Sequence, residues 1–181
     1  FANSSVTIEP SAQVNSTQRT IIYSQNDGGN VIVRGKLTSG DELQIKSSDD
    51  LIVEASAELS AILSAKLNSE GGYLIVDGIL EAGGTVVLES EQEMQINGSV
   101  HGVSYIQVYT DNGNLTISGE VSSDEFVTIF VVGERLEITG IIDAVVSVYI
   151  SSQLNSYTEI GGEIGASGDF GTVEVIMGDV S

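Results

Sequence analysis

The chain has no cysteine and no tryptophan, one proline, one histidine and only six lysine and arginine residues among 181. Without cysteine it forms no disulfide and offers neither a thiolate nucleophile nor a cysteine ligand for a metal. The sequence has no apolar run of the length that a membrane-spanning helix needs, so we expect no membrane insertion. We expect the single His101 on the surface, and no serine has a nucleophile-elbow pattern around it. We therefore predict no catalytic residues.

The shortage of basic residues leaves a large negative charge. With 26 aspartate and glutamate residues the formal net charge is −20. Such a charge repels nucleic acid and anionic membrane surfaces, and we exclude both as direct partners. Two interpretations stay open: the charge keeps a protein with exposed strand edges soluble, or carboxylates at turns bind calcium. The calcium candidates are Asp49, Asp50, Asp124 and Glu125.

A short phrase of alternating apolar residues, closed by a small residue, returns seven times at steps of 20 to 23 residues. A repeat of this period is typical of stacked, quasi-one-dimensional folds. Glycine at the closing position suits a sharp bend, or a place where a side chain would collide with the neighbouring coil. The closing residues are Gly35, Ala55, Gly78, Gly98, Gly119, Gly140 and Gly162.

Each repeat predicts one strand around the small residue and a second strand about eight residues later, because apolar residues alternate there. An antiparallel sandwich or barrel also has short strands, but it does not require residue-for-residue repetition. We therefore predict an all-β fold, a single right-handed parallel β-helix of about eight coils of about 21 residues. Residues 1–181 form one domain, with 1–30 as an irregular first coil and 31–181 as regular coils. The extra residues of the first coil are expected at 15–18 or 24–29.

The alternation also predicts which side chains point inward. The residue two positions before each closing residue should form one stacked inward row. Its members are Val33, Val53, Val76, Ile96, Ile117, Ile138 and Ile160. In the second of the seven repeats the same numbering places Ala57 and Leu63 inward, and in the last repeat it places Phe170 inward.

Four N-glycosylation sequons are present, at Asn3, Asn15, Asn97 and Asn114. Their use depends on whether the source glycosylates its surface proteins. Outward tyrosines would indicate carbohydrate binding, but they do not fall at one position of successive repeats, and we interpret them as scattered surface residues. Surface glycans are a second candidate class of partner.

Repeats such as Leu115–Val121 followed by Phe126–Phe130 resemble those of filamentous-haemagglutinin-like exoproteins, over roughly residues 31–180. The resemblance lies in the style of the repeat. It implies a secreted, right-handed β-helix that serves as a surface adhesin or a fibre shaft. The start at Phe1 is interpreted as that of a processed chain, and we expect an extracellular or cell-surface location.

An open β-helix ends in strand edges that can template another chain. We therefore predict a structural protein that stacks head to tail with itself into a filament or surface layer, an assembly strengthened by salt or calcium because of the negative charge. A part of a longer β-helical adhesin and a carbohydrate-active β-helix enzyme are the alternatives. The predicted assembly residues are Phe1, Val6, Ile8, Val173 and Val175.

Overall fold

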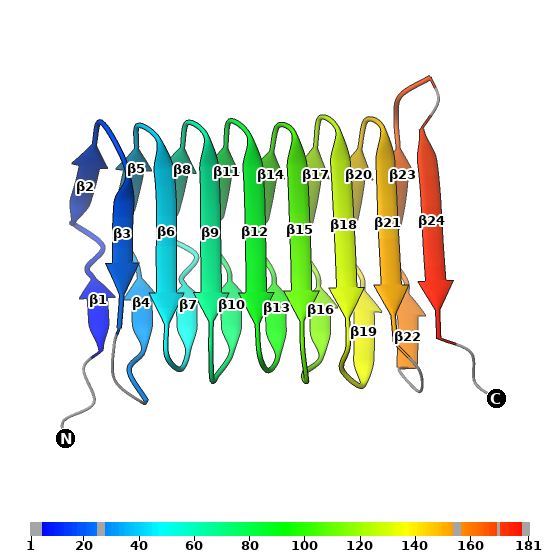
Figure 1. The fold of residues 1–181 in the computed structure, drawn as a ribbon, viewed down its shortest axis with the longest axis horizontal. Helices are drawn as coiled ribbons and strands as arrows, with labels where there is room; N and C mark the ends of the chain where they lie inside the picture. The colour runs from blue at the N-terminus through cyan, green and yellow to red at the C-terminus, as the bar shows by residue number, and fades with distance from the viewer. Residues whose placement is uncertain (1–4, 25–27, 154–156, 170, 179–181) are drawn as a thin grey trace.

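The computed structural model describes residues 5–24, 28–153, 157–169 and 171–178. All regular structure in this part of the chain is β-strand, and it contains no helix that could span a membrane. The strands form three sheets that run along one axis, and every strand pairs in parallel with its equivalent in the next coil (Figure 1). Phe1 and Asn3 lie outside the described residues.

Each coil contributes one strand to each sheet. Sheet A contains β1 (Val6–Ile8), β4 (Val31–Val33), β7 (Leu51–Val53), β10 (Leu74–Val76), β13 (Met94–Ile96), β16 (Leu115–Ile117), β19 (Arg135–Ile138) and β22 (Tyr157–Ile160). Sheet B contains β2 (Gln13–Ser16), β5 (Lys36–Ser39), β8 (Glu58–Ala61), β11 (Ile79–Ala82), β14 (Ser99–Gly102), β17 (Glu120–Ser123), β20 (Ile141–Ala144) and β23 (Glu163–Ala166). Sheet C contains β3 (Thr20–Tyr23), β6 (Glu42–Ser47), β9 (Ser64–Ser69), β12 (Thr85–Ser90), β15 (Tyr105–Thr110), β18 (Phe126–Val131), β21 (Ser147–Ser152) and β24 (Thr172–Met177).

The predicted parallel β-helix is confirmed. Eight coils follow one another, and the chain winds as a right-handed coil from β1 at one end to β24 at the other (Figure 1). The prediction of two strands per coil is wrong, because the predicted strand around each small residue bends there into two strands. In the fourth coil, for example, β10 in sheet A ends at Val76 and β11 in sheet B begins at Ile79.

The third coil has a different register from the predicted one. Its turn between β7 and β8 holds four residues, 54–57, where the neighbouring coils have two. Ala57 therefore takes the corner position before β8, and Leu59 pairs with Leu37 and Leu80 in the inward row. Leu63, predicted inward, is exposed in the turn before β9. The insertion could not be recognised from the sequence, because apolar residues occupy every second position through it, at Leu59, Ala61, Leu63 and Ala65.

The first and last coils also contain extra residues. In the first coil they lie in the turn 9–12, between β1 and β2, and in the turn 24–30, between β3 and β4. The predicted site at 15–18 is wrong, because it overlaps β2. The alternative at 24–29 falls in the second of these turns, where 25–27 are not described. In the last coil, Val173 pairs with Val148 and takes the place predicted for Phe170, which is not described.

The interior consists of aliphatic rows that run along the axis, and it confirms the predicted inward row. Six of its seven members are fully buried, and they pair in register from coil to coil. Ile160, in the last coil, is the exception with 40% exposure, because no described coil covers it. Burial of about 25 cal/mol per Å² of apolar surface makes these rows the main source of stability.

The corner between sheets A and B is crowded. A Cβ atom added at Gly119 would overlap the carbonyl oxygen of Gly98 in the preceding coil, and Gly140 meets Gly119 in the same way. In the two-residue turns at this corner glycine is required because of this contact between coils, whereas the four-residue turn 54–57 has Ala57 at the equivalent position. Left-handed backbone is not the reason, since among described glycines only Gly28, with φ of 78°, has positive φ. Of the two explanations that the sequence left open, close approach is therefore the general one.

At the corner between sheets C and A, buried hydroxyls bond to the backbone of the turns. The Ser90 hydroxyl donates to Gly72 O at 3.0 Å, and the Ser69 hydroxyl donates to Asp49 O at 2.5 Å. These bonds satisfy turn carbonyls that the sheets leave without a partner. Thr110 occupies the same row, but its buried Oγ1 has no hydrogen-bond partner within the described structure.

Replacing Thr110 by valine should stabilise the protein by about 1 kcal/mol, because it removes an unsatisfied buried hydroxyl without changing the shape of the side chain. The next residue in the row, Val131, shows that the site accepts valine. Ser90→Ala is the matched comparison and should destabilise by about 1 kcal/mol, because a satisfied bond is lost. Urea unfolding followed by circular dichroism measures both changes. A loss of stability in Thr110→Val would contradict the assignment.

Candidate functional site

The amino-terminal end of the solenoid leaves its interior open. β1, β2 and β3 are the edge strands of the three sheets. Val6, Ile8, Val14 and Ile22 point toward the core but are only partly buried, since no described coil covers them. The predicted assembly residues Val6 and Ile8 thus lie on this open end.

The carboxy-terminal end is open in the same way. β22, β23 and β24 are the opposite edge strands. Ile160 and Val173 are 40% and 44% exposed, whereas their partners in the preceding coil, Ile138 and Val148, are fully buried. Val175 is partly buried against the core. The predicted assembly residues Val173 and Val175 therefore lie on the second open end.

Charge is distributed unevenly along the axis. Residues 1–66 contain five of the six Lys and Arg beside eight acidic residues, a net charge of −3. Residues 67–181 contain only Arg135 beside 18 acidic residues, a net charge of −17. The basic side chains tie adjacent coils together, as in Lys36 to Glu58 at 2.6 Å and Lys66 to Glu89 at 2.7 Å. The total charge of −20 does not reveal this gradient, because it sums over both halves of the chain.

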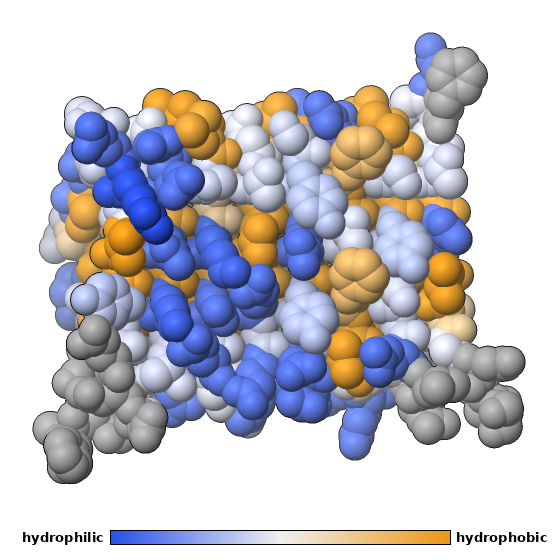
Figure 2. Space-filling view, in the orientation of Figure 1, coloured by the Kyte–Doolittle hydropathy of each residue, from blue (hydrophilic) through white to orange (hydrophobic). Residues whose placement is uncertain are grey.

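Aromatic side chains gather on the outer face of sheet C, over β15, β18 and β21 (Figure 2). Tyr105 pairs with Phe126 and Tyr109 pairs with Phe130, and the rings of Phe130 and Tyr149 lie 5.6 Å apart between centroids. The interpretation of the tyrosines as scattered is therefore wrong for this face. The two phenylalanines complete the cluster, and their outward positions in the alternating strand Phe126–Val131 were the signal that could have revealed it.

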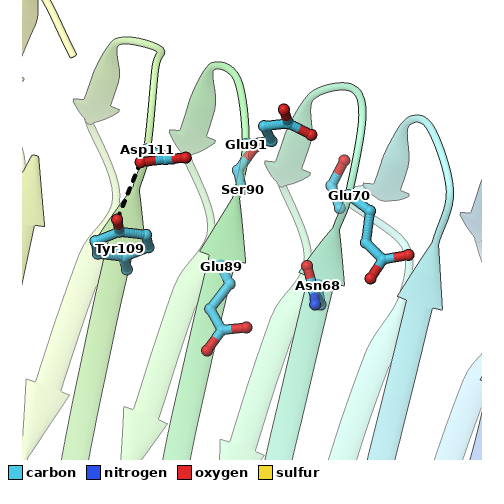
Figure 3. A pocket seen from close by; sticks show the side chains of 8 residues that line it. Asn68, Glu70, Glu89, Ser90, Glu91, Tyr109 and Asp111 are labelled. Carbon is cyan, nitrogen blue, oxygen red and sulfur yellow. Dashed lines mark hydrogen bonds between the residues drawn. The ribbon is translucent and has the colours of Figure 1, made fainter. Parts of the chain in front are cut away.

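A shallow groove lies at the margin of this cluster, where β9, β12 and β15 end (Figure 3). Glu70, Glu89, Glu91 and Asp111 line it, together with the ring of Tyr109. The Tyr109 hydroxyl donates to Asp111 Oδ1 at 3.1 Å. Partial burial, this hydrogen bond and the negative charges of Asp111 and Glu89 raise the pKa of the Tyr109 phenol above its ordinary value of 10.0. The phenol therefore remains a hydrogen-bond donor throughout the physiological range.

The structure does not bring the calcium candidates together. Asp49 and Asp50 lie in the turn between β6 and β7, and Asp124 and Glu125 lie in the turn between β17 and β18, at a different corner and three coils away. Asp50 Oδ1 instead accepts the backbone N–H of Tyr73 at 3.0 Å. Within the described residues no group of three or more histidine or acidic side chains is arranged to hold a metal. Calcium binding remains an untested prediction.

Of the three sequon asparagines that are described, Asn15 and Asn97 are exposed and Asn114 is half-buried. The Asn97 amide donates to Asp77 Oδ1 at 2.8 Å and accepts from the Ser118 hydroxyl at 2.7 Å. Asn97 thus links three coils at the corner between sheets A and B. A sugar attached to it would have to break this ladder of side chains.

His101 lies half-buried on the outer face of sheet B, between Glu81 and Ser122 of the adjacent coils. His101 Nδ1 and Ser122 Oγ are 3.2 Å apart. This order of acid, imidazole and hydroxyl is one that nucleophilic catalysis uses. The backbone N–H groups of β14 and β17 are held in the sheet, however, so the row offers no backbone donors for an oxyanion. The contact that the structure shows is a hydrogen bond between two half-buried side chains on this outer face.

Comparison with protein-family models, with curated proteins and with solved structures finds no match to this chain. The resemblance to filamentous-haemagglutinin-like exoproteins therefore remains a prediction. Three features of the molecule bear on its function, namely the two open ends, the charge gradient and the outer face of sheet C.

Proposed function

We propose that this protein is an extracellular structural subunit that stacks head to tail with further copies into a filament or a surface layer. The observation that carries the proposal is the pair of open ends, where inward apolar rows and strand edges continue to the last described coil. An open strand edge pairs readily with another strand, and apolar side chains left at a surface favour association. Repetition of one such contact between unlike surfaces gives a fibre.

The two ends match when the register of the solenoid is continued across the joint. The same rows that run through the molecule would place Ile160 over Ile8, Ile164 over Val14 and Val175 over Ile22 of the next copy. Each of these pairs is apolar. None of the described strand positions would place two like charges opposite each other across the joint, since Glu159, Glu163 and Glu174 would face uncharged side chains.

The charge gradient favours this polarity over the alternatives. A tail-to-tail contact would bring together two halves of strongly negative charge, at a large electrostatic cost. A head-to-tail contact brings the acidic half against the half that carries Arg19, Lys36 and Lys46. The total charge still opposes association, so the filament should form more readily when salt screens it.

The test is a charge placed at one open end. Ile160→Glu should abolish assembly, because it buries an unpaired carboxylate in the joint. Ile79→Glu is the matched control: it makes the same change at an isoleucine that is 43% exposed on the outer face of sheet B, in the fourth of the eight coils. Sedimentation velocity and negative-stain electron microscopy measure assembly. The two salt concentrations are about 0.1 M and about 1 M, because the Debye length falls between them from about 10 Å to about 3 Å.

We expect filaments from the wild type and from Ile79→Glu, longer at high salt, and monomers from Ile160→Glu. Parallel samples with calcium and with chelator test the predicted effect of calcium on assembly. A wild-type monomer under every condition would contradict the proposal, as would equal assembly by both variants. A monomer would instead favour the alternative of an adhesive part of a longer solenoid, whose own coils cover both ends. Turnover of polysaccharides by the purified chain would favour the enzyme.

A further inference from the structure

The outer face of sheet C carries a surface that the end-to-end assembly does not use. We define the aromatic face as the nine outward side chains of β15, β18 and β21. These side chains alternate with the buried ones along each strand, and all nine remain at least partly exposed. They are Tyr105, Gln107, Tyr109, Phe126, Thr128, Phe130, Ser147, Tyr149 and Ser151.

The composition of the aromatic face differs from that of the rest of the molecule. None of its nine side chains is charged, in a chain whose net charge is −20. Five are aromatic, and the other four carry a hydroxyl or an amide. Exposed rings in a cluster indicate a binding surface, since isolated apolar residues on a surface need no explanation but contiguous ones do. On the neighbouring coils charged side chains return, as Lys66, Glu89 and Glu174.

Four of the five rings form two rows along the solenoid axis. Tyr109 and Phe130 form one of them, on adjacent strands about 4.8 Å apart. Tyr149 pairs with Thr128 and so lies between the two rows, with its ring centroid 5.6 Å from that of Phe130 and the two ring planes inclined by 56°. Tyr105 and Phe126 form the second row, about 13 Å away along the strands at about 3.3 Å per residue. Rings arranged in this way can contact an extended ligand at several points, while the polar side chains between them provide hydrogen bonds.

The area of the face argues against a second copy of the chain as the occupant. Three strands and six residues give about 14 Å by about 20 Å, or roughly 300 Å². A stable protein–protein interface buries about 800 Å² on each partner. Lateral packing of two copies would therefore have to extend onto β9 and β12 and cover the ion pair between Lys66 and Glu89.

The charge of the molecule limits the ligand further. A polyanion, whether nucleic acid or an acidic polysaccharide, is repelled by the net charge of −20. A polycation would find no carboxylate within the aromatic face, since Glu89 and Asp111 lie at its margin. Those marginal carboxylates can accept hydrogen bonds from the hydroxyl groups of an uncharged ligand, in the groove beside Tyr109 (Figure 3).

We propose that the aromatic face binds a neutral, linear polysaccharide, with sugar rings packed on the rings of Tyr109, Phe130 and Tyr149 and hydroxyl groups bonded to the polar side chains around them. Apolar faces of sugar rings pack on aromatic rings, and the equatorial hydroxyls reach Gln107, Thr128 and the groove carboxylates. This proposal does not depend on filament formation, because the face is complete within one copy.

Native gels cast with a soluble polysaccharide provide the test, because binding slows the protein in proportion to its affinity. The probes are mixed-linkage β-glucan, xyloglucan, galactomannan and dextran, with polygalacturonate as a polyanion and glycol chitosan as a polycation. Calorimetric titration with the neutral probe that retards the protein most then gives the dissociation constant. We expect retardation by at least one neutral probe, little change with salt, and no retardation by polygalacturonate.

Two comparisons, each with a matched control variant, locate the binding site. Tyr109→Ala and Phe130→Ala should each weaken binding roughly three- to tenfold, the range of one aromatic contact. Tyr73→Ala, which removes a tyrosine that is 46% exposed in a turn outside the face, should leave it within about twofold. Thr128→Glu should abolish binding by placing a charge at the centre of the face, whereas Thr116→Glu makes the same change on sheet A and should not.

Several results would overturn the proposal. One is the absence of retardation by every neutral probe. Another is equal loss of binding in Tyr73→Ala and Tyr109→Ala. A third is retardation by glycol chitosan alone, removed by salt, which would show an ion-exchange surface. If the face variants instead change the sedimentation of the protein without any polysaccharide, the face is a lateral contact between copies. Circular dichroism and thermal unfolding of each variant check that the fold is retained.

Discussion

Gly119→Ala is expected to unfold the central coils. The Cβ atom of alanine would overlap the carbonyl oxygen of Gly98 and lie 2.6 Å from the carbonyl oxygen of Asn97. Both atoms belong to the backbone of the preceding coil, so relief requires the two coils to separate and the hydrogen bonds between β13 and β16 to stretch. We expect a loss of more than about 4 kcal/mol, which is a large part of the stability of an ordinary domain.

The matched control is Gly161→Ala, one residue from the equivalent corner of the last coil. A Cβ atom at Gly161 would meet nothing within 4 Å. The free energy of unfolding of this variant should therefore lie within about 1 kcal/mol of that of the wild type, since only the flexibility of the unfolded chain changes. Urea unfolding at low protein concentration, followed by circular dichroism, compares the two. Comparable stability of Gly119→Ala and Gly161→Ala would show that the coils are less closely packed at this corner than the structure indicates.

Ile117→Ala should cost about 2–5 kcal/mol, the usual range for a large-to-small change in a packed interior. Ile117 is fully buried between Ile96 and Ile138 of the adjacent coils, and its loss leaves a cavity that rigid sheets on three sides cannot close. The control belongs to the same row. Ile160→Ala makes the same change at 40% exposure and should cost less than half as much.

Denaturant midpoints and slopes in dilute solution, where no filament forms, provide this comparison. Equal losses in Ile117→Ala and Ile160→Ala would contradict the assignment of Ile160 to an open end. Under assembling conditions the expectation changes, because our proposal buries Ile160 in the joint between copies. Ile160→Ala should then weaken assembly, while a solution of monomers remains almost as stable as the wild type.

The inward rows could be predicted from the sequence because they follow from its period alone. Equivalent positions of a stack lie directly above one another, so a residue type that repeats every 20 to 23 positions identifies a row. The same logic located the glycine corner. It failed in the third coil, where the two additional residues of the turn 54–57 preserve the alternation of apolar and other residues, so the shift of register leaves no trace in the pattern.

The repeat pattern of the sequence predicts only part of the candidate functional surfaces. The places of Val6, Ile8, Val173 and Val175 in the first and last described coils could be predicted, because the apolar repeat extends over them. The buried hydroxyl row at the corner between sheets C and A was missed. Serine in a sequence of this composition indicates a turn or a surface, and only the structure shows its hydroxyl bonded to the carbonyl of another coil.

The sequence by itself determined the coil, its length and the side chains that fill it, because burial of apolar rows is a requirement that every coil repeats. Tertiary structure alone decided where the coil bends into three strands and which outward side chains become neighbours. Phe130 and Tyr149 are 19 residues apart in the chain and belong to different rows of the sheet, yet their rings lie 5.6 Å apart. Outward positions are free of the packing requirement, so their chemistry varies from coil to coil, and parallel stacking brings them together at about the spacing of two strands.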